Sequence, residues 1–429
     1  MSPRRLLLLC YFYPPLAGGG VHRVLSFTRH LPAHGWACTV VCAGEGDYWV
    51  TDETLDARVP AETEVIRVPG GSVLATWRRV FRGRGDRLPG ESAAALRRWS
   101  DWWLLPDSYV GWAPRARAAA AKRIARGGVS AILSSSPPES VHLAALPLRR
   151  RFGIPWIADF RDPWVGLYRR TPPSAWHRRR QSQLERTVMS AADVVLSASR
   201  TQMDFSTAGS GARPRRVELI PNGFEPASDV ATAESPDPAW FVIAFTGTLS
   251  QVPDTDVFLE AVHELLSRHP EARRRVRVRL AGPYDPSYAD RAVALGLRGI
   301  VEFLGQRSQP EVRTLQRRAD LLALWIPRGS GYRAALPGKL YEYLDAGRPV
   351  VALLEPQDEA VELVRRAGGT VVAPGARAAL TDELERRYRA WSTNGREPDA
   401  RPAWLDDFAR ERLAGRLARV LDQVCGART

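Results

Sequence analysis

Short and almost continuously apolar runs alternate with helical patterns along the whole chain. Residues 6–11 form the first run, apolar residues recur at helical spacing over 21–31, and a second run follows at 38–43. Strands that are apolar on both faces are typical of parallel sheets covered by helices on both sides. The runs expected to be strands are 6–11, 38–43, 65–68, 132–134, 156–159, 194–197 and 217–221, then 241–245, 276–281, 301–304, 321–326, 350–354 and 370–372. The alternation therefore predicts an α/β fold with two Rossmann-like, doubly wound parallel sheets.

A segment rich in proline, alanine, serine and acidic residues separates the two groups of strands. We interpret this segment, residues 223–238, as a linker between a domain over 1–222 and a second domain over 239–403. The final residues, 404–429, are helical in pattern. Ligands of such sheets bind at the carboxyl ends of the strands, so we expect the functional groups in loops after strands, facing a central cleft.

The chain is strongly basic, with 61 Lys and Arg against 47 Asp and Glu and a net charge of +14. This balance favours an anionic partner such as a nucleotide, a phospholipid surface or a nucleic acid; a solvated basic surface explains it equally well. The sequence has no zinc-finger or RRM motif and its arginines are dispersed, so we do not expect nucleic acid. Only two of the basic residues are lysines, Lys122 and Lys339.

The four cysteines include no C-x-x-C pair, and three of them lie in apolar runs. This usage fits a reducing cytoplasm and indicates neither a disulfide framework nor a zinc site. No apolar run reaches the roughly 18 residues that span a bilayer, and we interpret the apolar N-terminus as a buried strand rather than an export signal. We therefore expect a cytoplasmic protein.

Three loops after predicted strands carry candidate functional residues. The first holds Gly18, Gly19 and Gly20 before a helix, where backbone amides can approach a phosphate or sugar, although plain turn geometry also explains them. His22 follows on the first helical turn and faces either the cleft or solvent.

The second loop contains Asp159, Arg161 and Asp162 at the end of the predicted strand 156–159. Charged groups at this place are costly to bury unpaired. They form either a self-satisfied network that fixes the loop or a set that orients an acceptor.

The third loop opens a helix at Pro337 and Gly338, with Lys339 in the first turn and Glu342 on the same face. A cation in the first turn of a helix opposes the helix dipole, and nearly all other basic residues of this chain are arginines. A bound anion would explain both the position of Lys339 and the choice of lysine. A carboxylate one turn later can accept hydrogen bonds from two vicinal ribose hydroxyls. The alternative is a surface Lys–Glu pair.

Six motifs in this order and spacing resemble glycosyltransferase family 4, which has the GT-B fold. They are YFYPPLAGGGVHRV, SSSPPESVHLAAL, WIADFRDPW, LIPNGF, FTGTL and LPGKLYEYLDAGRPVVAL. The resemblance implies an N-terminal acceptor domain, a C-terminal donor domain and a final helix returning to the first domain. It implies retaining transfer of a sugar from a nucleotide-diphospho sugar to a hydroxyl acceptor, without a tightly bound cofactor or metal, in bacterial polysaccharide or glycoconjugate biosynthesis.

The resemblance also assigns site residues by position. Gly18 to Gly20 match the loop near the donor diphosphate, Arg161 falls where many members hold a histidine, and Asp162 matches the aspartate after it. Glu342 matches the second of two ribose-binding glutamates; Ala334 replaces the first, and Thr248 replaces an arginine after Gly247. Either Lys339 takes over the diphosphate charge with help from Arg333, or donor binding is weakened. The expected sites are as follows: catalytic Arg161, Asp162 and Lys339; donor-binding Gly18, Gly19, Gly20, Gly247, Thr248, Arg333, Lys339, Leu340 and Glu342; acceptor-binding His22, Asp159, Asp107 and Trp103.

Tryptophans and arginines are interleaved between Trp77 and Trp112, with the pair Trp102 and Trp103 preceding Asp107. Amphipathic aromatics with arginine suit an anionic membrane surface or a bulky acceptor, and tryptophans that pack on the sheet are the alternative. We thus expect a small-molecule, glycan or lipid-linked acceptor and peripheral association with the inner face of the cell membrane. Two other functions stay open: a GT-B nucleotide-sugar epimerase, and a catalytically silent or anionic-surface-binding paralogue.

Overall fold

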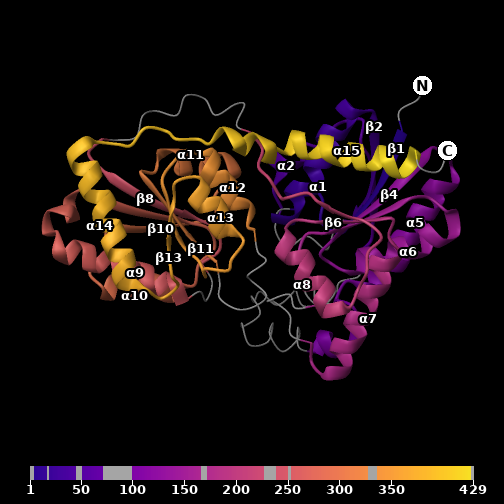
Figure 1. The fold of residues 1–429 in the computed structure, drawn as a ribbon, viewed down its shortest axis with the longest axis horizontal. Coiled ribbons are helices and arrows are strands. Elements are labelled where there is room, and N and C mark those ends of the chain that lie inside the picture. The colour runs from indigo at the N-terminus through magenta and orange to yellow at the C-terminus, as the bar shows by residue number, and fades with distance from the viewer. Residues whose placement is uncertain are drawn as a thin grey trace, which may run out of the picture. The chain divides into compact units, whose positions relative to one another are not determined.

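The computed structural model describes residues 4–16, 19–44, 51–70, 99–165, 172–226, 238–249, 253–326 and 336–426. The chain divides into two compact units (Figure 1). One is built from residues Met1–Gly223 together with Arg410–Thr429, and the other is Phe224–Ala409. Most of the expected linker, residues 227–237, lies outside the described residues, but Phe224 at its start is fully buried in the core of the second unit.

The first unit contains a parallel sheet in the order β3-β2-β1-β4-β5-β6-β7. Its strands are β1 (Arg4–Cys10), β2 (Trp36–Ala43), β3 (Glu64–Val68), β4 (Val129–Ser136), β5 (Trp156–Phe160), β6 (Val194–Ser197) and β7 (Val217–Leu219). The order reverses between β1 and β4, so the loops after these two strands diverge to opposite faces of the sheet.

Helices connect these strands and cover both faces. The helices are α1 (Gly19–His30), η1 (Leu31–His34), α2 (Glu53–Asp56), η3 (Val110–Trp112), α5 (Ala113–Ala125), α6 (Ser140–Phe152), α7 (Ala175–Ala191), α8 (Arg200–Ser210) and α15 (Arg410–Gly426). Side chains of β1 alternate between two cores: Leu6 and Leu8 pack with α1 and α15, and Leu7 and Leu9 with α5 and α6. Burying each leucine stabilises the fold by about 1.5–3 kcal/mol.

The second unit repeats this plan with a parallel sheet in the order β10-β9-β8-β11-β12-β13. Its strands are β8 (Phe241–Thr246), β9 (Val276–Ala281), β10 (Val301–Gly305), β11 (Leu321–Trp325), β12 (Val350–Leu353) and β13 (Thr370–Val372). Every strand run expected from the sequence is therefore confirmed, and both strand orders are those of doubly wound sheets.

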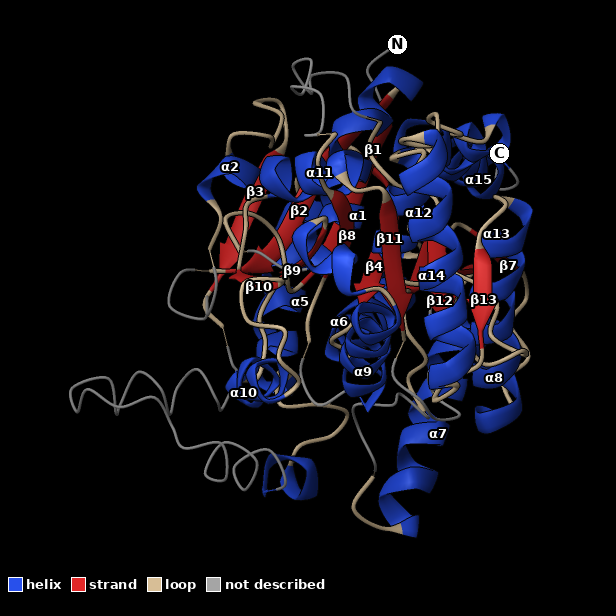
Figure 2. Cartoon of the chain, turned by 90° about the vertical axis from the view of Figure 1, so that its left-hand side faces the viewer, coloured by secondary structure: helices blue, strands red, loops and turns tan. Residues whose placement is uncertain are grey.

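Helices also flank this sheet on both faces, as the blue helices around the red strands illustrate (Figure 2). They are α9 (Pro253–Arg268), η4 (Pro270–Arg274), α10 (Pro286–Ala294), α11 (Gln309–Arg318), α12 (Gly338–Asp345), α13 (Ala360–Arg366), α14 (Arg377–Asn394) and η6 (Ala403–Phe408). Phe241, Ile243 and Phe245 of β8 pack with α9 and α14, whereas Ala244 packs on the side of α12 and α13.

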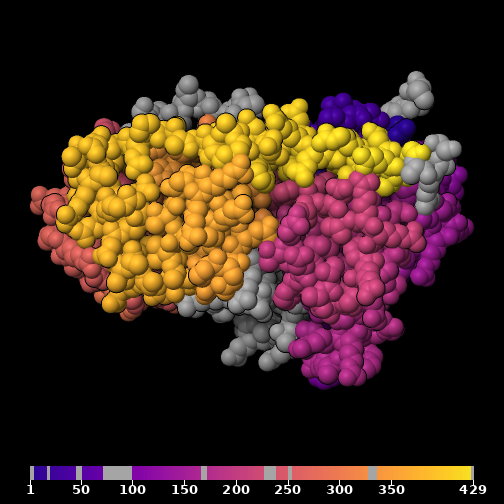
Figure 3. Space-filling view, in the orientation of Figure 1, coloured from indigo at the N-terminus to yellow at the C-terminus, as the bar shows by residue number. Residues whose placement is uncertain are grey.

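The C-terminal helix begins later than the sequence pattern suggested. Residues 403–408 form the 3-10 helix η6 in the second unit, and Ala409 is extended, with φ of −62° and ψ of 133°. The helix α15 therefore starts at Arg410 and packs on the first unit, where Leu413, Leu417 and Leu421 join the core with Leu6 and Leu8. Figure 3 shows α15 in yellow along the surface of that unit. Within the described ranges, no helix combines the length and apolarity needed to cross a bilayer.

Candidate functional site

Loops after β8, β9 and β10 meet at the carboxyl edge of the second sheet. The Gly247 amide donates to the Ala281 carbonyl at 2.8 Å, and the Gly282 amide donates to the Gly305 carbonyl at 2.8 Å. Both Gly247 and Gly282 have positive φ, 135° and 132°, and a Cβ on Gly282 would lie 2.0 Å from the Gly247 carbonyl oxygen. Only glycine fits these two positions, so the loops approach each other more closely than side chains would allow.

The side chain of Lys339 extends from the first turn of α12 over this edge. Its Nζ lies 4.0 Å from the centroid of the Phe245 ring, and a Cβ on Gly247 would be 3.2 Å from the same Nζ. Phe245 in turn stacks on Trp325 at 4.0 Å. Among the described residues, no carboxylate lies within ion-pair distance of Lys339. Burial lowers the pKa of the Lys339 ammonium to about 7, while the charge of Glu342 opposes that shift.

Glu342 lies one turn further along α12, on the wall of a polar pocket. The pocket is lined by Glu225, Arg313, Gln316, Arg317, Glu342, Asp345 and Ala346. Gln316 Nε2 donates to Thr246 Oγ1 at 2.9 Å and to Glu342 Oε2 at 3.4 Å. The Thr246 amide donates to the Tyr343 hydroxyl at 2.7 Å. These bonds fix α12 against the end of β8, and the long bond to Gln316 leaves the Glu342 carboxylate able to accept hydrogen bonds from a ligand.

The other donor-binding residues expected from the sequence occupy different positions. Thr248 is exposed, directly after Gly247. Leu340 is fully buried in the core and its amide donates to the Pro337 carbonyl at 3.0 Å, so its side chain serves packing. Gly18, Arg333 and the replaced position Ala334 lie outside the described residues.

Asp159, expected to bind the acceptor, is instead sequestered at the end of β5 in the first unit. Its two carboxylate oxygens accept hydrogen bonds from Arg23, at 2.8 Å and 3.0 Å, and Ser135 donates a third bond at 2.7 Å. Arg23 is 3% exposed and Asp159 is not exposed at all. Arg23 also donates to the carbonyls of Ile220 and Pro221, both at 2.7 Å. Asp159 thus anchors α1 to β5, and its role in acceptor binding stays a prediction.

Arg161 is also buried, and backbone carbonyls surround its guanidinium. It donates to the carbonyls of Ser136 at 2.7 Å and Pro137 at 2.9 Å, and to that of Gly20. Burial lowers the pKa of Arg161, and the carboxylates of Asp159 and Asp162 oppose that shift. A Cβ on Gly20 would lie 2.6 Å from the guanidinium, so any larger residue there would require Arg161 to shift. Arg161 thus joins the glycine turn before α1 to the end of β4; Asp162, next to it, is half-buried.

Four more of the expected residues lie in the first unit. His22 is half-buried in the first turn of α1, and Gly19 opens that helix. Asp107 is buried and caps α6, because its oxygens accept from the Ser140 amide at 2.8 Å and the Ser140 hydroxyl at 2.5 Å. This role explains its burial without an acceptor. The side chain of Trp103 is 72% exposed.

Sequence reasoning missed three structural contributors to these sites: Arg23, Gln316 and Tyr343. Arg23 lies between the buried Val21 and Val24 in α1, and a charge on a buried helical face signals a buried partner. The sequence around Gln316 and Tyr343 did not indicate that these residues make buried hydrogen bonds, because a polar residue near the end of an amphipathic helix is ordinarily exposed to solvent.

Comparison with solved structures shows that the whole chain has the GT-B fold. Sucrose-phosphate synthase from Thermosynechococcus elongatus superimposes with a TM-score of 0.66 and 17% identity, covering 99% of this chain and 100% of the other. Anabaena Alr3699/HepE, solved in complex with UDP and glucose, gives a TM-score of 0.62 and 15% identity, covering 98% and 100%.

Sequence models of two glycosyltransferase domains match the two units in turn. The model described as glycosyl transferase 4-like domain matches residues 18–223, and that described as glycosyl transferases group 1 matches residues 241–389. The chain belongs to the family 4-like glycosyltransferases. This family 4-like chain is 29% identical over 197 residues to D-inositol 3-phosphate glycosyltransferase from Corynebacterium efficiens, a stretch that covers 42% of this chain and 44% of that relative. The matched stretch thus spans less than half the length of either protein.

Proposed function

We propose that this family 4-like chain transfers a glycosyl group from a nucleotide-diphospho sugar to a hydroxyl acceptor, with retention of anomeric configuration. The placement of Lys339 and Glu342 on α12 beside Gly247 carries the proposal. The Anabaena structure with UDP and glucose supports a nucleotide-sugar donor. Neither the epimerase nor the silent paralogue is favoured by the family match.

In this proposal the diphosphate lies at the N-terminal end of α12. Lys339 Nζ is held over the Phe245 ring at the glycine edge, where a point charge can meet phosphate oxygens. The Glu342 carboxylate, one turn away, accepts hydrogen bonds from the ribose hydroxyls. A half-buried cation favours the leaving diphosphate most when that group gains charge, so Lys339 stabilises the transition state more than the ground state.

The reaction breaks the bond between the anomeric carbon and the diphosphate oxygen and forms a bond from that carbon to the acceptor oxygen. The anomeric carbon develops oxocarbenium character, and the departing phosphate takes the proton of the acceptor hydroxyl. Attack from the face that the phosphate leaves retains the configuration. We expect no tightly bound cofactor or metal. Arg161 is a positioning residue here, since its guanidinium holds the Gly20 turn to the end of β4.

The acceptor is proposed to be a small molecule, a glycan or a lipid-linked sugar, used in the cytoplasm. Asp162, His22 and Trp103 remain the residues proposed to contact or orient it. Thr248 and the glycines of the first loop are proposed to line the donor, together with Arg333.

The experiment compares Lys339→Ala with Lys122→Ala, because the chain has one other lysine and that residue is exposed on α5. Thermal shift with nucleotide diphosphates and turnover of their sugars are measured for both variants. We expect Lys339→Ala to lose about tenfold or more in nucleotide affinity and Lys122→Ala to match the wild type. Turnover by Lys339→Ala near the wild-type rate would refute the role of Lys339.

A further inference from the structure

Four exposed tryptophans gather in the first unit at the start of α7. Of the six large apolar side chains that are exposed among the described residues, these four are the tryptophans: Trp99 at 51%, Trp102 at 54%, Trp103 at 72% and Trp176 at 61%. We call them the tryptophan patch. Exposed apolar side chains are common singly, but clustered indoles mark an interaction surface.

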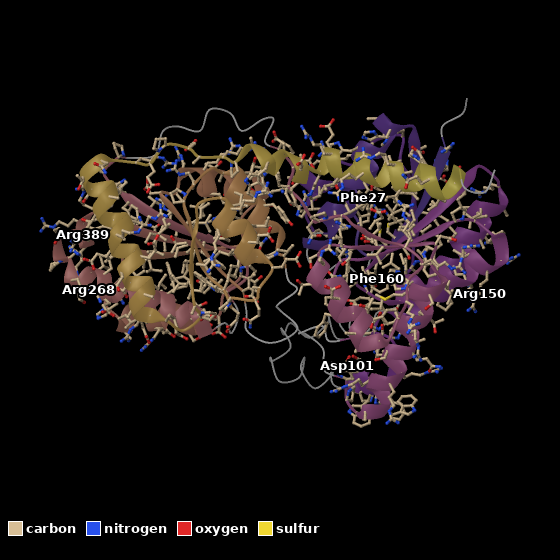
Figure 4. The ribbon with its side chains drawn as sticks, viewed as in Figure 1. Phe27, Asp101, Arg150, Phe160, Arg268 and Arg389 are labelled. Atoms are coloured by element: carbon tan, nitrogen blue, oxygen red, sulfur yellow. The ribbon has the colours of Figure 1, made fainter. Side chains whose placement is uncertain are left out.

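The patch has a buried support. Residues 99–103 form a helical turn, and Trp176 lies in the first turn of α7. Between them lies His177, which is 4% exposed and packs edge-on against Trp102 at 5.1 Å and Trp176 at 4.9 Å. Its Nε2 lies 3.1 Å from the Trp102 carbonyl oxygen. Figure 1 shows the purple turn beside the lower end of α7, and Figure 4 labels Asp101 there.

Further bonds fix both segments that carry the indoles. The Ser174 hydroxyl caps α7 by accepting from the His177 amide, and Gln181 of α7 donates to the Pro106 carbonyl at 2.7 Å. The indoles therefore project from a packed base. Among the described residues, the four rings are exposed although the base beneath them is hydrogen-bonded within the unit.

Cations adjoin the patch. Arg178, Arg179 and Arg180 follow Trp176 and are all exposed, and Arg180 donates to Gln183 at 2.7 Å. The half-buried Asp101 is the one acidic residue within 99–103. The segments 99–103 and 176–180 together carry three exposed arginines and one half-buried aspartate, a positive balance that matches an anionic partner.

We propose that the tryptophan patch and Arg178–Arg180 dock the protein on an anionic phospholipid surface. Indole rings prefer the headgroup region, where the ring leaves water and the N–H stays hydrated. Arginines beside them are attracted to anionic lipids, and each acts within a Debye length of the surface. Exposed indole rings on a packed base suit a broad, deformable surface. This inference does not depend on the donor site of the second unit.

The test is co-sedimentation of the full chain with two kinds of vesicle. One kind contains phosphatidylcholine alone, and the other contains phosphatidylcholine with about 30% phosphatidylglycerol as the anionic lipid. Two variants are compared with the wild type: Trp99→Ser/Trp176→Ser and Arg178→Glu/Arg179→Glu. Matched controls are Val293→Ser, which removes an exposed apolar side chain of α10, and Arg273→Glu/Arg274→Glu, which reverses two exposed arginines of η4.

We expect the wild type to bind the anionic vesicles, with affinity falling as salt rises, and the arginine variant to bind about 30-fold more weakly. The tryptophan variant should lose at least about tenfold, and both controls should bind like the wild type. Tryptophan fluorescence of the wild type should shift to the blue on binding. Equal binding by all variants, or no binding by the wild type, would overturn the proposal, as would capture of a protein partner through the patch without any vesicle binding. Nucleotide binding, followed by thermal shift, reports separately on the proposed donor site.

Discussion

Nucleotide binding should take up a proton at Lys339. The pKa of this ammonium is lowered to about 7, so Lys339 is neutral in a fraction of roughly 0.9 of the protein molecules at pH 8 and in about 0.1 at pH 6. A diphosphate at the start of α12 favours the charged form, so binding returns the proton. The expected uptake at Lys339 is about 0.9 proton per nucleotide at pH 8, and affinity should fall about tenfold for each pH unit above 7.

Isothermal titration calorimetry in buffers of different ionisation enthalpy measures this uptake directly. The nucleotide phosphate also titrates near neutral pH, so Lys339→Met is the matched variant, and the difference between the two proteins isolates the lysine. A difference near zero at pH 8 would refute the reasoning.

The same shift links stability to pH in the empty protein. Between pH 7 and the ordinary value of 10.5, the unfolded lysine holds a proton that the folded lysine has lost. Because the unfolded state binds more protons there, the free energy of unfolding should rise with pH across this window and stay level below it. Lys339→Met should remove that slope, as chemical denaturation at pH 6.5, 8 and 9.5 can establish.

Three further predictions concern stability and loop geometry. Gly247→Ala should lower the free energy of unfolding by about 1–3 kcal/mol, because a φ of 135° strains any residue with a side chain. It should also weaken nucleotide binding, because the new Cβ would lie 3.2 Å from Lys339 Nζ. The control Gly296→Ala, with φ of 68° and open space around it, should keep nucleotide affinity. Arg23→Met should lower the free energy of unfolding by about 3–5 kcal/mol in urea, since it leaves Asp159 buried and unpaired, and a wild-type midpoint would contradict the burial of this pair. Asp107→Ala should cost about 0.5–2 kcal/mol through the lost α6 cap and leave nucleotide affinity unchanged, so a selective loss of affinity would argue against a capping role.

The sequence predicted the strands and the strand-end location of the polar residues well, because both follow from hydrophobic period and turn chemistry. It also singled out Lys339 and Glu342, since a lysine is rare in this chain and opposes the helix dipole where it stands. The structure brings Lys339 to Gly247 and Phe245, a contact that sequence spacing alone did not indicate.

Roles in the first unit were harder to predict. Asp159 lies near the end of β5, and Arg161 and Asp107 lie in loops, as functional residues often do, yet all three make hydrogen bonds inside the first unit. Whether a charged residue at a strand end serves a ligand or the backbone depends on long-range partners such as Arg23, 136 positions away from Asp159. A single sequence does not reveal that pairing.

The two ends of the chain build one unit, and this has a consequence for synthesis on the ribosome. Leu6 and Leu8 are synthesised before the second unit, whereas Leu413, Leu417 and Leu421, which cover the same face of the sheet, are synthesised after it. Until these three leucines have been added, the sheet of the first unit presents an uncovered apolar face, although the second unit already has all of its described strands. A chain truncated just before residue 410 would therefore keep the whole second unit, while the first unit would expose an apolar face of its sheet to chaperones.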